Sequence, residues 1–157
     1  MENIQGKADF LKNKYIPLLN TLDPRTPGKW GKMNVQQMIE HMSDYVRIAN
    51  GKTPMSVVTE ADKLPRMQGF LASEKPFPEN TPNVLMPETP PPVKHLSVAE
   101  AIAELSDELE TFFDVHNSDP AKTTANPFFG ELAFEQQVQL LYKHSAHHLR
   151  QFGVELV

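Results

Sequence analysis

Two of the six histidines in this chain, His144 and His148, stand four residues apart near its end. In an α-helix this spacing places both imidazoles on one face, one turn apart, where both can reach a single metal ion. Imidazole is the commonest metal ligand in proteins. Because Ser145 follows His144, the glutamate of a His-Glu-x-x-His protease helix is absent, and this class of enzyme is excluded.

Helical angles separate these two histidines from their neighbour. At about 100° per residue, His148 lies about 60° from the centre of the apolar face of its helix, and His144 lies at the margin. His147 falls about 160° away, which predicts a side chain in solvent or at most a donor to a metal ligand. On an earlier helix, His41 lies about 110° from the centre of the apolar stripe. Taken alone, such a boundary histidine is more often a surface or hydrogen-bonded residue than a metal ligand.

The roles of the other polar residues near these helices follow from their local positions. We expect His116 to be a helix-end residue that suits the helix dipole, and His95 to lie in a loop beside a proline run. Asp44 is either a carboxylate that orients a histidine ring or an ordinary solvated one. Glu40 points about 100° away from the histidine that follows it. Arg150 either meets an anionic substrate or lies on the surface.

The histidines need helices to position them, and four segments have helical periodicity. They are residues 4–22, 34–50, 97–117 and 133–152. Pro17 should kink or split the first of them, because proline removes one helical hydrogen bond. Asn34 with Gln37, and Ser97 with Glu100, have the spacing of capping boxes at the starts of the second and third.

Residues 52–95 contain most of the prolines and only a weak helical pattern, over residues 59–71. We interpret this segment as a long crossover between the second and third helices that can cover the mouth of a site. Residues 119–130 are expected to form a loop, and no strand pattern is evident. The sequence therefore predicts an all-α four-helix bundle in which residues 1–157 form one domain.

Composition narrows the classes of partner and ligand. The net charge of −5 argues against a nucleic-acid or membrane-surface partner, since both need a basic face. The absence of cysteine excludes disulfides and thiolate zinc sites, so nitrogen and oxygen must hold any metal. We see no signal peptide and no stretch as long as a membrane span, so a cytoplasmic protein is expected.

Three stretches of sequence carry a resemblance to a known family. They are residues 30–42 (WGKMNVQQMIEHM), 126–136 (NPFFGELAFEQ) and 144–152 (HSAHHLRQF). Together they resemble an uncharacterised bacterial branch of the DinB/YfiT-like superfamily. The resemblance implies a four-helix bundle with a long crossover and a metal site whose ligands are His41, His144 and His148, with His147 outside it. Ala133 departs from the pattern, because relatives usually have a Ser or Thr helix cap there.

The resemblance also implies a reaction class. Three neutral imidazoles leave a divalent ion, zinc or nickel, with an open position that is typical of catalytic sites. Such an ion can activate water for hydrolysis or a low-molecular-weight thiol for S-transfer to a small-molecule substrate. The alternative is a non-catalytic bundle that binds metal or another ligand, or that dimerises. A homodimer is compatible with either reading.

Overall fold

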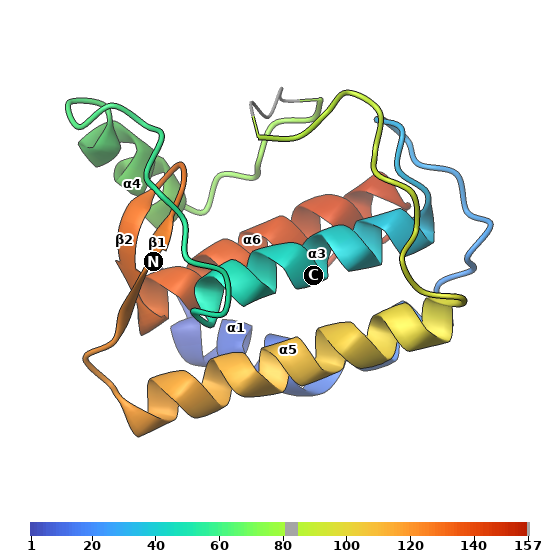
Figure 1. The fold of residues 1–157 in the computed structure, drawn as a ribbon, viewed down its shortest axis with the longest axis horizontal. Coiled ribbons are helices and arrows are strands. Elements are labelled where there is room, and N and C mark those ends of the chain that lie inside the picture. Colours follow the sequence, from blue (N-terminus) through green and yellow to red (C-terminus); the bar gives the residue numbers. More distant parts are fainter. Residues whose placement is uncertain (81–84, 157) are drawn as a thin grey trace.

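Helices make up most of residues 1–80 and 85–156, the part of the chain that the computed structural model describes (Figure 1). Two short strands form an antiparallel hairpin in this part. In chain order the elements are α1 (Ile4–Asp9), the π-helical segment η1 (Phe10–Lys14), α2 (Tyr15–Thr21), α3 (Val35–Ala49), α4 (Leu64–Ala72), α5 (Val98–Ser118), β1 (Thr123–Asn126), β2 (Gly130–Ala133) and α6 (Phe134–Gln151).

The N-terminal helical run changes its winding just before Pro17. The N–H of Tyr15 donates to the carbonyl of Phe10, five residues earlier, which is a π-helical bond. Pro17 has no N–H to donate, and its ring would clash with the carbonyl of Asn13 in a regular helix. A wider turn removes this conflict, so the run continues through η1 into α2 instead of ending.

Side chains cap the two helices whose starts had capping-box spacing. Asn34 Oδ1 accepts the N–H of Gln37 at 2.8 Å, and Gln37 Oε1 accepts the N–H of Asn34 at 2.9 Å, so α3 has both halves of the box. Ser97 Oγ accepts the N–H of Glu100 at 3.2 Å at the start of α5. These bonds satisfy amide groups that have no partner inside the helix.

The hairpin corrects the prediction of an all-α protein with a loop at residues 119–130. Each strand has only four residues, too few for an alternating pattern to stand out in the sequence. The turn is held by Asn126 Oδ1, which accepts the N–H groups of Phe128 and Phe129. Gly130 has φ +83°, a left-handed conformation that favours glycine. Because β2 leads directly into α6, the hairpin fixes the start of the helix that carries His144 and His148.

The start of α6 compensates for Ala133. Alanine has no side-chain oxygen to cap the helix, but Gln136 Oε1 accepts the N–H of Ala133 at 3.0 Å. This is the reciprocal half of a capping box. The helix therefore begins where the sequence predicted, without the usual Ser or Thr.

The main hydrophobic core lies between the N-terminal run, α3, α5 and α6. Helix α3 contacts both α5 and α6, and α1 contacts α6 (Figure 1). A second cluster joins α4, the hairpin and α6, and consists of Leu71, Phe129, Leu132 and Leu140. The contact between α3 and α6 brings the predicted ligand of one helix beside those of the other.

The segment between α3 and α5 was predicted to be a crossover over residues 52–95, of which 81–84 lie outside the described residues. Its helix α4 begins five residues later than the weak pattern at 59–71 indicated. Farther along, Glu40 accepts the N–H of Lys94 at 2.7 Å and that of His95 at 3.1 Å, which ties the segment to α3. Burial raises the pKa of this carboxyl, but the hydrogen bonds outweigh it and hold the pKa below its ordinary value. Among the described helices, none is long and apolar enough to cross a membrane.

Candidate metal centre and its cavity

Three imidazoles from two helices converge on one point. His41 comes from α3, and His144 and His148 come from successive turns of α6. The Nε2 atom of His144 lies 3.1 Å from Nε2 of His41 and 3.0 Å from Nε2 of His148. One ring nitrogen from each lies within 4.8 Å of the other two. The structure thus brings together the three residues that the sequence nominated.

Gln151 determines which nitrogen of His148 carries the proton. The side-chain Nε2 of Gln151 donates to the backbone carbonyl of Trp30 at 2.9 Å, which fixes the orientation of the amide. Its Oε1 then faces Nδ1 of His148 at 2.8 Å, and because this oxygen can only accept, Nδ1 must donate. A neutral His148 therefore has its lone pair on Nε2, the atom that faces the other two histidines.

Burial keeps all three rings neutral at neutral pH. Loss of solvation lowers the pKa of His41 to about 4, although the charge of Asp44 acts in the opposite direction. Burial, followed by repulsion from the neighbouring histidines, holds the pKa of His144 well below its usual range. Burial and the proximity of His41 do the same to the pKa of His148. Neutral imidazoles are the form that binds metal, so no proton has to leave at neutral pH.

This donor set fits a divalent metal ion. Two ligands placed about 2.0–2.1 Å from a tetrahedral zinc lie about 3.3–3.4 Å apart. The separations of 3.0 and 3.1 Å from His144 to the other two rings are close to this value, and all three nitrogens lie within 4.8 Å of one another. Within the described residues the group contains only nitrogen donors, which suits zinc or nickel better than magnesium or calcium.

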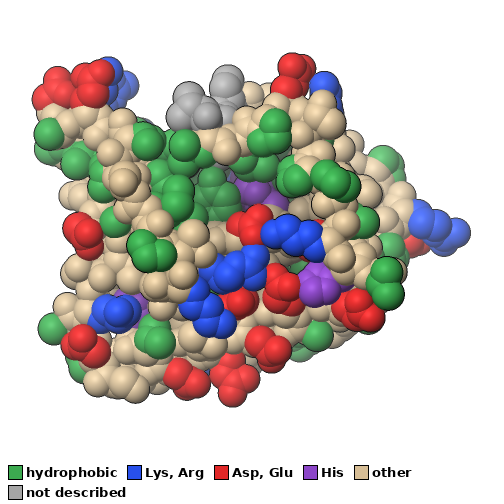
Figure 2. Space-filling view, viewed as in Figure 1, with side chains coloured by type: hydrophobic (Ala, Val, Ile, Leu, Met, Phe, Trp, Pro, Cys, Tyr) green, Lys and Arg blue, Asp and Glu red, His purple; other side chains and the backbone are tan. Residues whose placement is uncertain are grey.

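The histidine cluster, defined as His41, His144 and His148, opens into a cavity of about 860 Å³. Figure 2 shows a hollow in this face of the molecule, with histidine within it, hydrophobic side chains above and beside it, and charged side chains along its lower edge. The walls come from the 30–33 loop, α3, α4, the segment after α4, the hairpin turn and α6. A cavity of this size matches the pockets that proteins use for small molecules.

The prediction of a solvent-facing His147 was wrong. Its ring packs against Trp30, with centroids 5.3 Å apart, and against Phe77 at 6.1 Å, and it lines the cavity. The helical angle correctly placed this side chain away from the core. It gave no information on the 30–33 loop and the segment after α4, which cover that side of α6.

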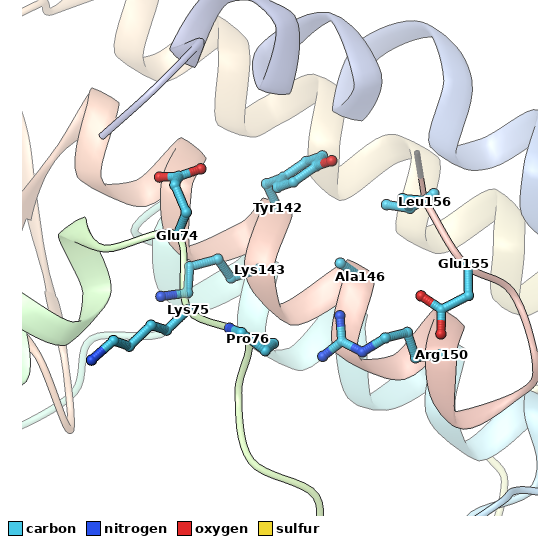
Figure 3. Close-up of a pocket in the computed structure, with 9 residues that line it drawn as sticks. All are labelled: Glu74, Lys75, Pro76, Tyr142, Lys143, Ala146, Arg150, Glu155 and Leu156. Carbon is cyan, nitrogen blue, oxygen red and sulfur yellow. The ribbon is translucent and has the colours of Figure 1, made fainter.

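Arg150 does not line this cavity. With Tyr142, Ala146 and Pro76 it lines a separate cavity of about 180 Å³ (Figure 3). Lys143 lines the same smaller cavity, and its ammonium donates to backbone carbonyls, including that of Phe70 at 2.8 Å. Burial lowers the pKa of Lys143 to about 8. The two cations of this part of α6 are therefore directed away from the histidine cluster.

The remaining candidates have structural surroundings. His116 is buried, and its Nε2 lies 3.2 Å from the carbonyl of Ala49, so it is a packed core residue as well as a helix-end one. His95 lies in a loop, as expected, and pairs with Glu104. Asp44 pairs with Arg47 in an ion-pair network on the outside of α3.

Several residues of the site escaped the sequence reasoning. Gln151 had no special pattern, because its importance depends on the loop that meets it. Tyr45 lies one turn after His41, and its ring centroid is 4.9 Å from those of both His41 and His144. Phe77 and Phe129 come from segments that were expected to be irregular, where periodicity gives no signal.

The molecule is thus a mostly helical protein with a three-histidine cluster in a small-molecule-sized cavity. The chain matches the family model of the DinB superfamily over residues 15–152, and it belongs to that superfamily. No curated protein and no solved structure matches it.

Proposed function

We propose that the protein is a metal-dependent enzyme that acts on a small molecule, with a divalent ion, zinc or nickel, held by His41, His144 and His148. The observation that carries the proposal is the convergence of three neutral imidazole nitrogens inside a cavity of about 860 Å³. Membership of the DinB superfamily supports the same reading. We further propose that the N-terminal run, α3, α5 and α6 form the family's four-helix bundle, with residues 52–95 as its crossover.

The ligand set supports hydrolysis or thiol S-transfer as the reaction type. When bound, a divalent ion with three neutral ligands keeps its full charge and an open position, so it lowers the pKa of water or of a thiol. The protein's own side chains position the metal ligands and exclude solvent from the site. Gln151 holds the His148 ring in one tautomer, and the aromatic walls keep water away from the reacting groups.

Metal content tests the first part of this proposal. Protein purified without a metal-affinity column should contain close to one zinc or nickel per chain, or take it up when the ion is added. Elemental analysis after gel filtration measures this directly. A protein that contains no metal as purified and takes up neither ion would overturn the proposed function.

Activity tests the second part. Hydrolysis of esters and amides, and consumption of thiols in the presence of electrophiles, should be screened with the metal-loaded protein. The reaction found should be lost in His148→Ala and retained in His95→Ala, a matched histidine outside the cavity that pairs with Glu104. If metal binds and no turnover occurs in either screen, the non-catalytic alternative replaces the enzyme.

A further inference from the structure

The walls of the large cavity are made mainly of flat and flexible apolar side chains. Its aromatic members are Trp30, Tyr45, Phe70, Phe77, Phe128 and Phe129. Phe77 and Phe129 have nearly parallel planes, 13° apart, with centroids separated by 6.5 Å, and Phe70 lies 5.8 Å from Phe77. Aromatic walls of this kind favour a ligand with flat apolar surfaces.

Three methionines complete the apolar lining, and they come from three different segments of the wall: Met33, Met67 and Met86. Thioether side chains are flexible and polarisable, so they adjust to ligands of different outline. The lining is therefore selective for apolar surface and tolerant in shape.

Charge is nearly absent from the described lining. Its only Lys, Arg, Asp and Glu residues are Lys32 and Glu88, and they pair with each other at 3.3 Å. Their side chains are 58% and 88% exposed, which places this pair at the rim. The two cations of α6 line the smaller cavity instead (Figure 3).

Two of the polar side chains that line the cavity already have partners within the protein. Asn126 Oδ1 accepts two backbone N–H groups of the hairpin turn, and the amide of Gln151 connects His148 to Trp30. A charged group taken into the cavity would lose its hydration without gaining a protein counter-ion. Such a transfer is unfavourable when no partner compensates it.

From this lining we infer that the substrate of the site has an uncharged aromatic or similarly flat apolar body, which lies against these walls. The inference rests on the proposed function, in that the cavity is taken to be the place where the substrate binds. It adds the substrate class, because away from the histidine cluster the described lining provides stacking surface and no unpaired charged side chain for a carboxylate, phosphate or ammonium group.

Two fluorescent probes of the same shape test this inference. N-phenyl-1-naphthylamine is uncharged, and 8-anilinonaphthalene-1-sulfonate is the same ring system with a sulfonate added. Trp30 is the only tryptophan of the chain and lines the cavity, so quenching of its emission reports binding at this site. We expect the uncharged probe to bind with saturating Trp30 quenching and at least about tenfold more tightly than the sulfonate.

A charge placed in the wall should reverse this preference. Met67→Arg puts a cation in the lining and should weaken the uncharged probe and tighten the sulfonate. Val58→Arg is the matched control, because Val58 is exposed, apolar and outside the lining, and it should change neither dissociation constant by more than about twofold.

Equal binding of the two probes to the chelated, unmodified protein, or no binding of the uncharged one, would overturn the inference. The comparison in the unmodified protein needs no variant, so it remains decisive if Met67→Arg does not fold. Each titration is done with the chelated and the zinc-loaded protein. If the protein binds no metal, the chelated protein should still prefer the uncharged probe. If the protein shows no such preference, its metal content is unaffected, so the two failures can be told apart.

Discussion

Helix α6 contributes to two partly buried polar clusters that are built in opposite ways. One is the histidine cluster. The other, here called the anchor cluster, consists of Lys7, Glu74, Gln139 and Lys143. In the anchor cluster, Lys7 Nζ donates to Glu74 at 2.5 Å and to Gln139 at 2.8 Å. Gln139 Nε2 in turn donates to the carbonyl of Leu71 at 3.0 Å. Donors and acceptors alternate, so the anchor cluster is complete within the protein.

The histidine cluster brings together three ring nitrogens, each of which can accept or donate according to its tautomer. The proton of His148 is used outside the cluster, by Gln151, and its Nε2 lone pair is directed towards His144. Buried polar groups are normally satisfied by fixed partners, so three ring nitrogens that converge beside a cavity, with the lone pair of His148 among them, indicate a place for a cation. Burial of polar groups therefore does not by itself identify a binding site. The anchor cluster and the histidine cluster differ in whether the protein itself supplies a matching donor for each acceptor.

The largest expected effect is the loss of metal binding in His144→Ala. This residue supplies the nitrogen that lies nearest to both others, and removing one ligand of three should weaken zinc affinity by more than about 100-fold. Competition with a chromophoric chelator measures the dissociation constant. The matched control is His147→Ala, which lies in the same cavity and outside the cluster. Equal losses of zinc affinity in His144→Ala and His147→Ala would contradict the distinction between the histidine cluster and the rest of the cavity wall.

The anchor cluster should show the reverse behaviour. Gln139→Leu leaves Lys7 with one acceptor fewer and the carbonyl of Leu71 with only the longer hydrogen bond from Lys143, at 3.4 Å. We expect the free energy of unfolding to fall by about 2 kcal/mol, while zinc affinity stays within about twofold. Urea denaturation measures the first quantity. Gln5→Leu, at an exposed position of α1, is the control for the substitution itself. A large change in zinc affinity would show that the two clusters are coupled.

A smaller effect is expected for Gln151→Leu, which removes the partner of His148 without removing a ligand. Loss of the hydrogen bond to Nδ1 frees the ring to rotate and to change tautomer. Zinc affinity should fall by about tenfold, the usual size for such a partner. The fluorescence of Trp30 should change as well, because its carbonyl loses the same amide. Unchanged zinc affinity would mean that packing alone orients the ring.

The smallest effect concerns pH and Glu74. Its hydrogen bond with Lys7 lowers the pKa of this carboxyl from 4.5 to about 2. The ionised carboxylate therefore favours folding above a pH of about 4.5, and the contribution disappears as the pH falls towards 2. Because the side chain is 41% exposed, we expect the contribution to be below about 1 kcal/mol.

Unfolding of the unmodified protein and of Glu74→Gln at several pH values measures this contribution. The stability difference should be present at pH 7 and should shrink through the acid range. A stability difference that does not change with pH would mean that the shape of the Glu74 side chain, and not its charge, stabilises the fold.

Much of the helical frame could be predicted from the sequence, because local signals determine it. Asn34 and Gln37 cap α3 as their spacing predicts, and Gly153 has φ +87° just after α6. The angle between His144 and His148 along α6 is also local, and both rings point to the same place.

The parts that escaped prediction depend on contacts between distant residues. His147 is covered by Trp30 and Phe77, and nothing in the pattern of α6 indicates this. The hairpin strands are too short for periodicity. That His41 meets the pair on α6 followed from the resemblance, since spacing along one helix cannot place a residue on another.

The contacts that complete the histidine cluster join residues that lie far apart in the sequence, and the amide of Gln151 makes one of them. It joins His148 to Trp30, which lies 121 residues away from Gln151 in sequence, and His41 lies 103 residues from His144. A chain that has formed only its local helices has two of the three imidazoles on one segment and the third elsewhere. The complete cluster requires the contacts that cost the most loop entropy. An ion that needs all three rings would therefore bind only the native fold. Its binding would stabilise the folded chain at the last step of folding.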